Sequence, residues 1–231
     1  MRPTPANARG SNASIASRDR EQEAAPPART VLDAADLSFR YRDGARAVLD
    51  GVNLRIERGD WVLLEGASGG GKSTLVSLLT GLREPSAGLL NSGGLDRRAL
   101  GDGAWRKRFA AAPQYHENHI LTGTLAFNLL LGRAWPPTPE DLAEAHAVCR
   151  ELGLGPVLER MPGGLHQVVG ETGWQLSQGE RSRVFLARAL LQNSEMIVLD
   201  ESFAALDPET LRQSMECTLM RAKTLLVVAH P

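Results

Sequence analysis

The stretch GASGGGKST, from Gly66 to Thr74, joins the apolar run GDWVLLEG to the helix-like run KSTLVSLLTGL. It matches the pattern GxxxxGK[ST], whose fixed positions are filled here by Gly66, Gly71, Lys72 and Ser73. Glycines allow backbone N–H groups to turn inward on phosphate oxygens, and the following helix adds the positive end of its dipole. A strand, a glycine loop and a helix in this order predict a P-loop that binds the phosphates of a nucleotide.

The residues at the end of this loop have separate roles in phosphate chemistry. Lys72 supplies a compact, mobile positive charge for the β and γ phosphates, and the Ser73 hydroxyl is a ligand for Mg²⁺. The alternative is a glycine-rich turn with an incidental lysine. For a P-loop we expect nucleotide contacts from the whole stretch, which consists of Gly66, Ala67, Ser68, Gly69, Gly70, Gly71, Lys72, Ser73 and Thr74.

A second run, MIVLDES, supplies the carboxylates that a P-loop needs. Its apolar residues predict a buried strand that ends in Asp200, at the sheet edge where open α/β folds bind ligands. Asp200 can hold the Mg²⁺ shell there. Glu201 follows directly and is placed to polarise a water for attack on the γ phosphate, so we predict it to be the general base. The alternative for Glu201 is that it caps the turn after the strand.

Composition sets limits on the partners and the compartment. The chain has 231 residues and a formal net charge of −1, which argues against nucleic acid as the main partner. Cys149 and Cys217 lack the spacing of a metal site or a disulfide scaffold, so a reducing, cytosolic compartment is the simpler reading. Because no apolar stretch approaches the roughly 20 residues that span a bilayer, any membrane-spanning part is expected elsewhere.

The chain divides into a polar arm and one folded domain. Residues 1–30 lack a hydrophobic period, and we predict a disordered arm or linker there. Two alternating runs between residues 31 and about 60 predict an antiparallel β layer. Thr138, Pro139 and Asp141 open an amphipathic helix through a capping box. Further apolar runs at 196–200 and 224–230 predict parallel strands that are covered on both faces.

With these motifs in order, the chain resembles the ATP-binding domains of ABC transporters from about Val31 to His230. The stretch LSQGE, Leu176 to Glu180, is similar to the signature motif of that family, and SFAALD, 202–207, is similar to its D-loop. The dipeptide at Pro113 and Gln114 is similar to the Q-loop, His230 to the switch histidine, and Tyr41 to the aromatic residue that stacks on adenine. Without the resemblance, Gln114 would be interpreted as an ordinary loop residue and His230 as a residue at the end of a strand. Tyr41 would be interpreted as a core or surface residue.

The resemblance implies a role for each of these residues. Gln114 is expected to contact Mg²⁺ or the attacking water, and His230 to donate a hydrogen bond to the γ phosphate. Pro231 favours an extended conformation for His230, which suits the end of a strand. Ser177 and Gly179 are expected to contact the γ phosphate of an ATP held by a second domain. The expected catalytic set is therefore Glu201, His230, Gln114 and Lys72, and the expected metal ligands are Ser73, Gln114 and Asp200.

Two further stretches indicate the subtype of the domain, and the signature itself departs from its common form. VGETG, 169–173, and LTGTLAFNLLLG after the Q-loop resemble exporter-type domains, which implies transport outward or between compartments. The signature reads Ser-Gln-Gly-Glu where the common form is Ser-Gly-Gly-Gln. We expect Glu180 to point away from phosphate, toward Arg181 or Arg183, because a carboxylate near phosphate would be repelled.

The expected fold is α/β, with a P-loop NTPase core, a mostly parallel sheet, an antiparallel β subdomain and an α-helical subdomain inserted at about residues 114–191. The expected function is Mg²⁺-dependent hydrolysis of ATP in a dimer of such domains, identical or different. The expected partner is a transmembrane domain, separate or fused. The ATP-binding domain itself is expected on the cytoplasmic side of the cell membrane, with no role for nucleic acid.

The alternative is a soluble ABC ATPase of translation or DNA repair, although those normally carry two such domains or a long coiled-coil insertion. A regulatory module that hydrolyses ATP slowly or not at all is the remaining alternative, and intact Lys72, Asp200 and Glu201 argue against it.

Overall fold

The structure, a computed structural model, describes residues 29–42, 44, 46–112 and 119–229. The polar arm expected at residues 1–30 therefore lies almost entirely outside the described residues. Gln114, in the expected Q-loop, and His230, the expected switch histidine, also lie outside them.

A four-stranded parallel sheet forms the centre of the molecule. Its strands are β3 (Trp61–Glu65), β10 (Leu225–Ala229), β9 (Met196–Asp200) and β6 (Phe109–Ala112), and they lie in the order β3-β10-β9-β6. Strand β9 is buried along its whole length, as its continuous apolar sequence predicts for a strand covered on both faces. The P-loop strand and the strand that ends in Asp200 thus belong to one sheet, as predicted.

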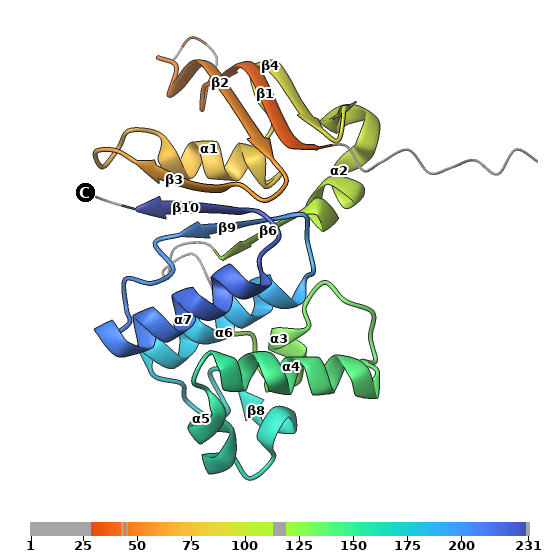
Figure 1. Ribbon diagram of the computed structural model, residues 1–231, viewed down its shortest axis with the longest axis vertical. Helices are drawn as coiled ribbons and strands as arrows, with labels where there is room; N and C mark the ends of the chain where they lie inside the picture. The colour runs from red at the N-terminus through yellow and green to blue at the C-terminus, as the bar shows by residue number, and fades with distance from the viewer. Residues whose placement is uncertain (1–28, 43, 45, 113–118, 230–231) are drawn as a thin grey trace, which may run out of the picture.

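The two faces of this sheet belong to two different hydrophobic cores. Met196 and Val198 of β9 face the core that contains α1 (Lys72–Leu79), whereas Ile197 and Leu199 face a core built from helices. Because side chains alternate along a strand, a run without polar residues is what this double burial requires. Figure 1 shows α1 on one side of the sheet and α6 (Gln178–Leu191) with α7 (Pro208–Arg221) on the other.

A second, antiparallel sheet covers the α1 side. It contains β1 (Thr30–Phe39), β2 (Leu49–Glu57), β4 (Ala87–Ser92) and β5 (Leu95–Asp96) in the order β2-β1-β4-β5. The expectation that this layer ends at about residue 60 was incomplete, because β4 and β5 return to it after α1. The return depends on Gly88, where a Cβ would lie 2.4 Å from the Asp36 carbonyl oxygen, so only glycine allows the close approach.

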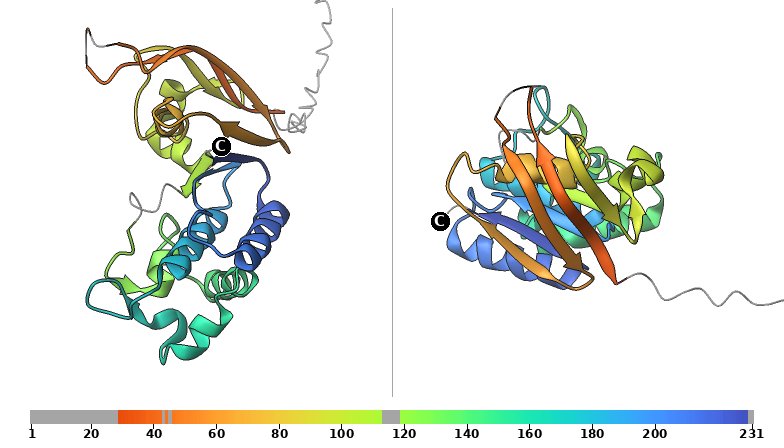
Figure 2. Two further views of the ribbon diagram at one scale, coloured as in Figure 1. Left: turned by 90° about the vertical axis from the view of Figure 1, so that its left-hand side faces the viewer. Right: turned by 90° about the horizontal axis from the view of Figure 1, so that it is seen from above.

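Helix α2 (Arg97–Arg108) packs beside the antiparallel sheet, against β4 and β5. Three further helices extend the molecule away from that sheet, as Figure 2 shows from two directions. They are α3 (Leu125–Leu129), α4 (Pro139–Glu151) and α5 (Gly155–Arg160), with a small ribbon of β7 (Gly123–Thr124) and β8 (Val168–Val169) beside a 3₁₀ turn at Gly164–His166. Residues of α3 to α7 share one core with the face of the parallel sheet that lies opposite α1. None of the helices in the described residues is long and apolar enough to cross a membrane.

Helix α4 begins as its sequence predicts. The Thr138 hydroxyl accepts a hydrogen bond from the Asp141 N–H at 3.2 Å, and the Asp141 carboxylate accepts one from the Thr138 N–H at 3.0 Å. The Thr138 N–H and the Arg133 guanidinium hold the pKa of Asp141 below its usual value. Gly153, with φ of 71°, lies just after the C-cap Leu152, where a left-handed residue commonly ends a helix.

Candidate nucleotide-binding site

The P-loop leaves β3 at Glu65 and enters α1 at Lys72. Gly71 is the N-cap of α1 and has left-handed φ and ψ of 84° and 9°, while Gly69 has φ of 78°. The Lys72 ammonium bends back over the loop and donates to the carbonyl oxygens of Gly66 at 2.6 Å and Ala67 at 3.1 Å. The loop is therefore already closed around the side chain that is predicted to contact phosphate.

The glycines of the loop fit an anion cradle. A Cβ at Gly70 would lie 3.0 Å from the Ala67 carbonyl oxygen, and a Cβ at Gly71 would lie 3.0 Å from Leu49 Cδ2 in a backbone conformation that L side chains rarely adopt. A side chain at either position would crowd its neighbours, and the loop N–H groups lie directly before the N-terminus of α1. The residues present thus suit the phosphates of a nucleotide.

Asp200 lies at the carboxyl edge of the sheet, level with the P-loop. Strand register shows this, because Val228 of β10 is the partner of both Leu64 in β3 and Asp200 in β9. Asp200 is buried, with 2% of its surface exposed. Glu201 follows with φ of 51° and donates its N–H to the Val228 carbonyl oxygen at 3.2 Å. A positive φ is uncommon for glutamate, and backbone strain of this kind is concentrated at functional sites.

The Ser73 hydroxyl and the Asp200 carboxylate are oxygen ligands of the kind that a hard divalent cation prefers. They would fill only some of the positions around such a cation. Ser73 is exposed in the first turn of α1, and the Asp200 carboxylate lies at the same edge of the sheet. Within the described residues, no group of three or more His, Cys, Asp or Glu side chains could hold a metal ion alone. A Mg²⁺ ion here would complete its shell with phosphate oxygens and water, as this ion usually does.

Tyr41 lies beside the P-loop helix and is held there by a hydrogen bond. Its hydroxyl is 3.0 Å from Thr74 Oγ1, and 56% of its surface is exposed. The Arg83 guanidinium carbon stands 4.9 Å from the centre of the Tyr41 ring, and the Phe39 ring meets it edge to face at 5.1 Å. No sequence pattern indicates that Arg83 covers one face of this ring.

The signature residues form the N-terminal cap of α6. The Ser177 hydroxyl accepts from the Glu180 N–H at 3.2 Å, and the Glu180 carboxylate accepts from the Ser177 N–H at 2.8 Å, which is a complete capping box. A Cβ at Gly179 would lie 3.5 Å from the Ala205 carbonyl oxygen, so the signature lies close to the D-loop stretch of its own chain. Ser177 is exposed at the tip of this helix.

The expected partner of Glu180 was wrong. Its carboxylate pairs with Arg160 of α5 at 2.7 Å rather than with its helix neighbours Arg181 or Arg183. Arg181 donates instead to the Leu176 carbonyl at 3.0 Å, and Arg183 to the Gly153 carbonyl at 2.7 Å. Helix spacing favoured the neighbours, but the capping box turns Glu180 back toward the helix start, where α5 supplies the cation.

The P-loop and the signature lie on different sides of the sheet within one chain. Helix α1 belongs to the core beneath the antiparallel sheet, and α6 belongs to the core on the opposite face. Figure 1 shows the two helices separated by the parallel strands. One chain therefore presents a phosphate cradle and a second helix tip as two separate surfaces.

A buried polar pair joins α6 to α3 and was not found from the sequence. Arg188 Nε donates to the Asn128 carbonyl at 2.7 Å, and the fully buried Asn128 side chain bonds both the N–H and the carbonyl of Leu121 at 2.8 Å. Burial lowers the pKa of Arg188 to about 10. The available signal was a polar residue inside each of two apolar helical runs, LAFNLLL and VFLARALL.

We expect Arg188→Met to lower the free energy of unfolding by about 2–3 kcal/mol, because buried carbonyl and amide groups would lose a charged donor. Urea denaturation measures the difference. Arg212→Met is the matched control: Arg212 pairs with Glu216 on the surface and is 69% exposed, so its loss should change stability by less than about 0.5 kcal/mol. Equal effects of the two substitutions would contradict the structural role of Arg188.

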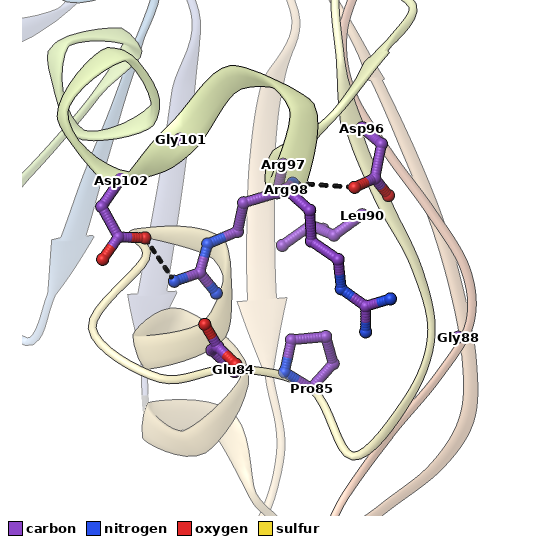
Figure 3. Close-up of a pocket in the computed structure, with 9 residues that line it drawn as sticks. All are labelled: Glu84, Pro85, Gly88, Leu90, Asp96, Arg97, Arg98, Gly101 and Asp102. Carbon is purple, nitrogen blue, oxygen red and sulfur yellow. Dashed lines mark hydrogen bonds and ion pairs between the residues drawn. The ribbon is translucent and has the colours of Figure 1, made fainter.

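A hollow of about 270 Å³ lies outside the predicted nucleotide-binding residues, at the start of α2, and Figure 3 shows its lining. Arg97 reaches across it and is only 6% exposed. Its guanidinium donates to the carbonyl oxygens of Arg83 and Gly81 and to the Asp102 carboxylate. These bonds fasten α2 to the end of α1, so Arg97 has a structural role there.

A family model described as ABC transporter matches residues 49–204, more than half of the chain. The chain belongs to the ABC transporter family. It is 36% identical over 201 residues to the ATP-dependent lipid A-core flippase of Polaromonas sp. strain JS666, with 86% of this chain and 33% of that protein covered. It is 34% identical over 202 residues to ABC transporter B family member 29, chloroplastic, of Arabidopsis thaliana, with coverage of 86% and 31%. The chain thus spans about a third of the length of these relatives.

The fold agrees with a solved ABC exporter. The structure of a bacterial Atm1-family ABC exporter with ATP bound superimposes with a TM-score of 0.78 and 28% identity, covering 88% of this chain and 35% of that one. The recognition of an exporter-type ATP-binding domain is confirmed, and so is the α/β fold with a P-loop core. The roles of single site residues and the domain boundaries at residues 30, 114 and 191 stay predictions.

Proposed function

We propose that this ABC domain binds ATP together with Mg²⁺ and hydrolyses it to drive transport across a membrane. The observation that carries the proposal is the common edge of the parallel sheet, where the P-loop follows β3 and Asp200 and Glu201 follow β9, in register through Val228. Phosphoryl transfer needs a cation and a phosphate cradle on one side and a water-orienting carboxylate close by. The strand order brings the P-loop and these two carboxylates to one edge of the sheet, which supports the proposal.

Each residue has a defined task in this proposal. The loop N–H groups and Lys72 bind the phosphates, and the ring face of Tyr41 opposite Arg83 stacks on the base. Ser73 and Asp200 would hold Mg²⁺, which supplies charge neutralisation for the β and γ phosphates when bound. Glu201 orients the attacking water and takes its proton. Gln114 and His230 keep their predicted roles, at the water or metal and at the γ phosphate.

A second ATP-binding domain completes the site. Ser177 and Gly179 lie on α6, across the sheet from α1, so in this proposal they contact an ATP that is held by the P-loop of the other domain. The exposed Ser177 hydroxyl already accepts from the Glu180 N–H and can still donate its proton to a phosphate oxygen. ATP binding then closes the dimer and hydrolysis releases it.

Export is the proposed use of this cycle. The relatives include proteins named as an ATP-dependent flippase and as an ABC exporter, and this chain spans about a third of each. We infer a transmembrane partner domain, fused or separate, with the ATP-binding domain at the cytoplasmic side of the membrane.

Fractionation of the source cells tests the transport proposal. The chain should sediment with membranes and be extracted by detergent as a complex that hydrolyses Mg·ATP. The control is the same lysate treated with nuclease and high salt, which releases proteins bound to ribosomes or DNA but leaves a membrane complex in the pellet. Recovery of the chain with ribosomes or DNA would contradict transport and favour the soluble ABC ATPase of translation or DNA repair.

A further inference from the structure

The carboxylate of Glu180 is held by two groups at the start of α6. One oxygen accepts from the Ser177 N–H at 2.8 Å and the other pairs with Arg160 Nη2 at 2.7 Å. The two side chains differ in environment, because 12% of the Glu180 side chain is exposed against 60% for Arg160. Arg160 is the last residue of α5, so the ion pair joins two helices that are distant in sequence.

This ion pair involves the same helical turn as the residues proposed to contact phosphate. Ser177 and Gly179 precede Glu180 in the same helical turn. A carboxylate there would repel a polyphosphate, whereas the glutamine of the common signature would be neutral. Most of the Glu180 side chain is withdrawn from water, so screening by solvent is weaker than at a fully exposed site.

We propose that Arg160 is a positioning residue for the shared nucleotide, which it serves by neutralising Glu180 and holding its carboxylate on the Ser177 N–H. The inference rests on the proposed function, because it requires an ATP that is held by a second domain. The pair makes a Ser-Gln-Gly-Glu signature equivalent in charge to a neutral one. The Ser177 hydroxyl accepts from the Glu180 N–H and can still donate its own proton to phosphate.

The other basic residues of this turn have different partners. Arg183 donates to the carbonyl oxygens of Gly179 and Gly153, and burial lowers its pKa, although nearby Glu180 and Asp207 act in the opposite direction. Arg181 donates to the Leu176 carbonyl. Arg160 is the cation whose guanidinium the structure places on the Glu180 carboxylate itself.

The test measures the ATP concentration that gives half-maximal dimer formation. The 231-residue chain carries Glu201→Gln in every sample, so that dimers accumulate. Sedimentation velocity measures the fraction of the chain in dimers as the Mg·ATP concentration increases. Three variants are added to that background: Arg160→Gln, Glu180→Gln and the double change. The control is Arg106→Gln, since Arg106 is 56% exposed, pairs with Asp102 and lies on the remote helix α2.

Arg160→Gln should raise the half-maximal ATP concentration about three- to tenfold, because it leaves the Glu180 charge beside the phosphate without its cation. The shift should shrink in high salt. Glu180→Gln keeps the capping box through its amide, so the double change should return the half-maximal concentration to that of the background. Arg106→Gln should leave it unchanged. The melting temperature should be the same for Arg160→Gln and Arg106→Gln.

Two results would overturn the inference while leaving the proposed function intact. One is an unchanged half-maximal concentration in Arg160→Gln. The other is a shift that persists in the double variant and follows a lower melting temperature, which would show that Arg160 serves only to hold α5 against α6. A background chain that forms no dimer at any ATP concentration would instead refute the proposed function, and this inference with it.

Discussion

Replacing Glu201 by Gln should lower the kcat of ATP hydrolysis about 10²- to 10⁴-fold and leave the affinity for ATP within about twofold, the range expected when a general base is lost. Glutamine has nearly the same shape but cannot take a proton from water. The left-handed backbone at this position, with φ of 51°, and the bond from its N–H to the Val228 carbonyl do not depend on the carboxylate. Steady-state turnover and equilibrium ATP binding, measured side by side, separate the two effects.

The control for this substitution is Glu209→Gln, which removes an exposed carboxylate in the first turn of α7. It should leave turnover unchanged. Retention of more than a tenth of the turnover by Glu201→Gln would be inconsistent with Glu201 as the base and would favour the alternative in which it only caps the turn after β9.

Replacing Lys72 by Met should weaken ATP binding about 100-fold or more, since a lysine on phosphate makes charge-assisted hydrogen bonds worth about 1.5–3 kcal/mol each. Methionine keeps most of the aliphatic stem and removes the ammonium. Titration calorimetry measures the affinity. Lys107→Met, at an exposed lysine of α2, is the control and should bind ATP as the unmodified chain does.

The same ammonium also closes the P-loop on itself, through the carbonyl oxygens of Gly66 and Ala67. The melting temperature of Lys72→Met must therefore be compared with that of Lys107→Met. An ATP affinity within threefold of the unmodified chain would contradict the role of Lys72. A loss of affinity in a folded variant supports it.

Features carried by local sequence were predictable. The P-loop pattern fixes glycines where the backbone must take left-handed angles, as Gly71 does, and the two apolar runs at 196–200 and 224–230 correspond to β9 and β10. The capping box of Thr138 and Asp141 depends only on residues three apart. A similar Ser-x-x-Glu pattern at Ser177 was present in the sequence and indicates where Glu180 turns.

Features that depend on distant segments were not predictable from local patterns. The pairing of β4 with β1 crosses the whole of α1, and it rests on a close approach at Gly88 that no periodicity announces. Arg160 meets Glu180 and Arg188 meets Asn128 because α5 and α3 pack near α6, over separations of 20 and 60 residues. Charges and amides inside apolar runs indicate that a partner is needed, but only the fold identifies it.

Sedimentation velocity of the Glu201→Gln chain, with and without saturating Mg·ATP, tests the central claim that two domains share the nucleotide. The chain is expected to sediment as a monomer alone and as a dimer with Mg·ATP. Addition of Ser177→Glu to the same chain should abolish the dimer. Residue 177 is proposed to face the phosphate at the start of α6, and a carboxylate there would repel it. A chain that binds Mg·ATP and remains monomeric at every protein concentration would contradict the account.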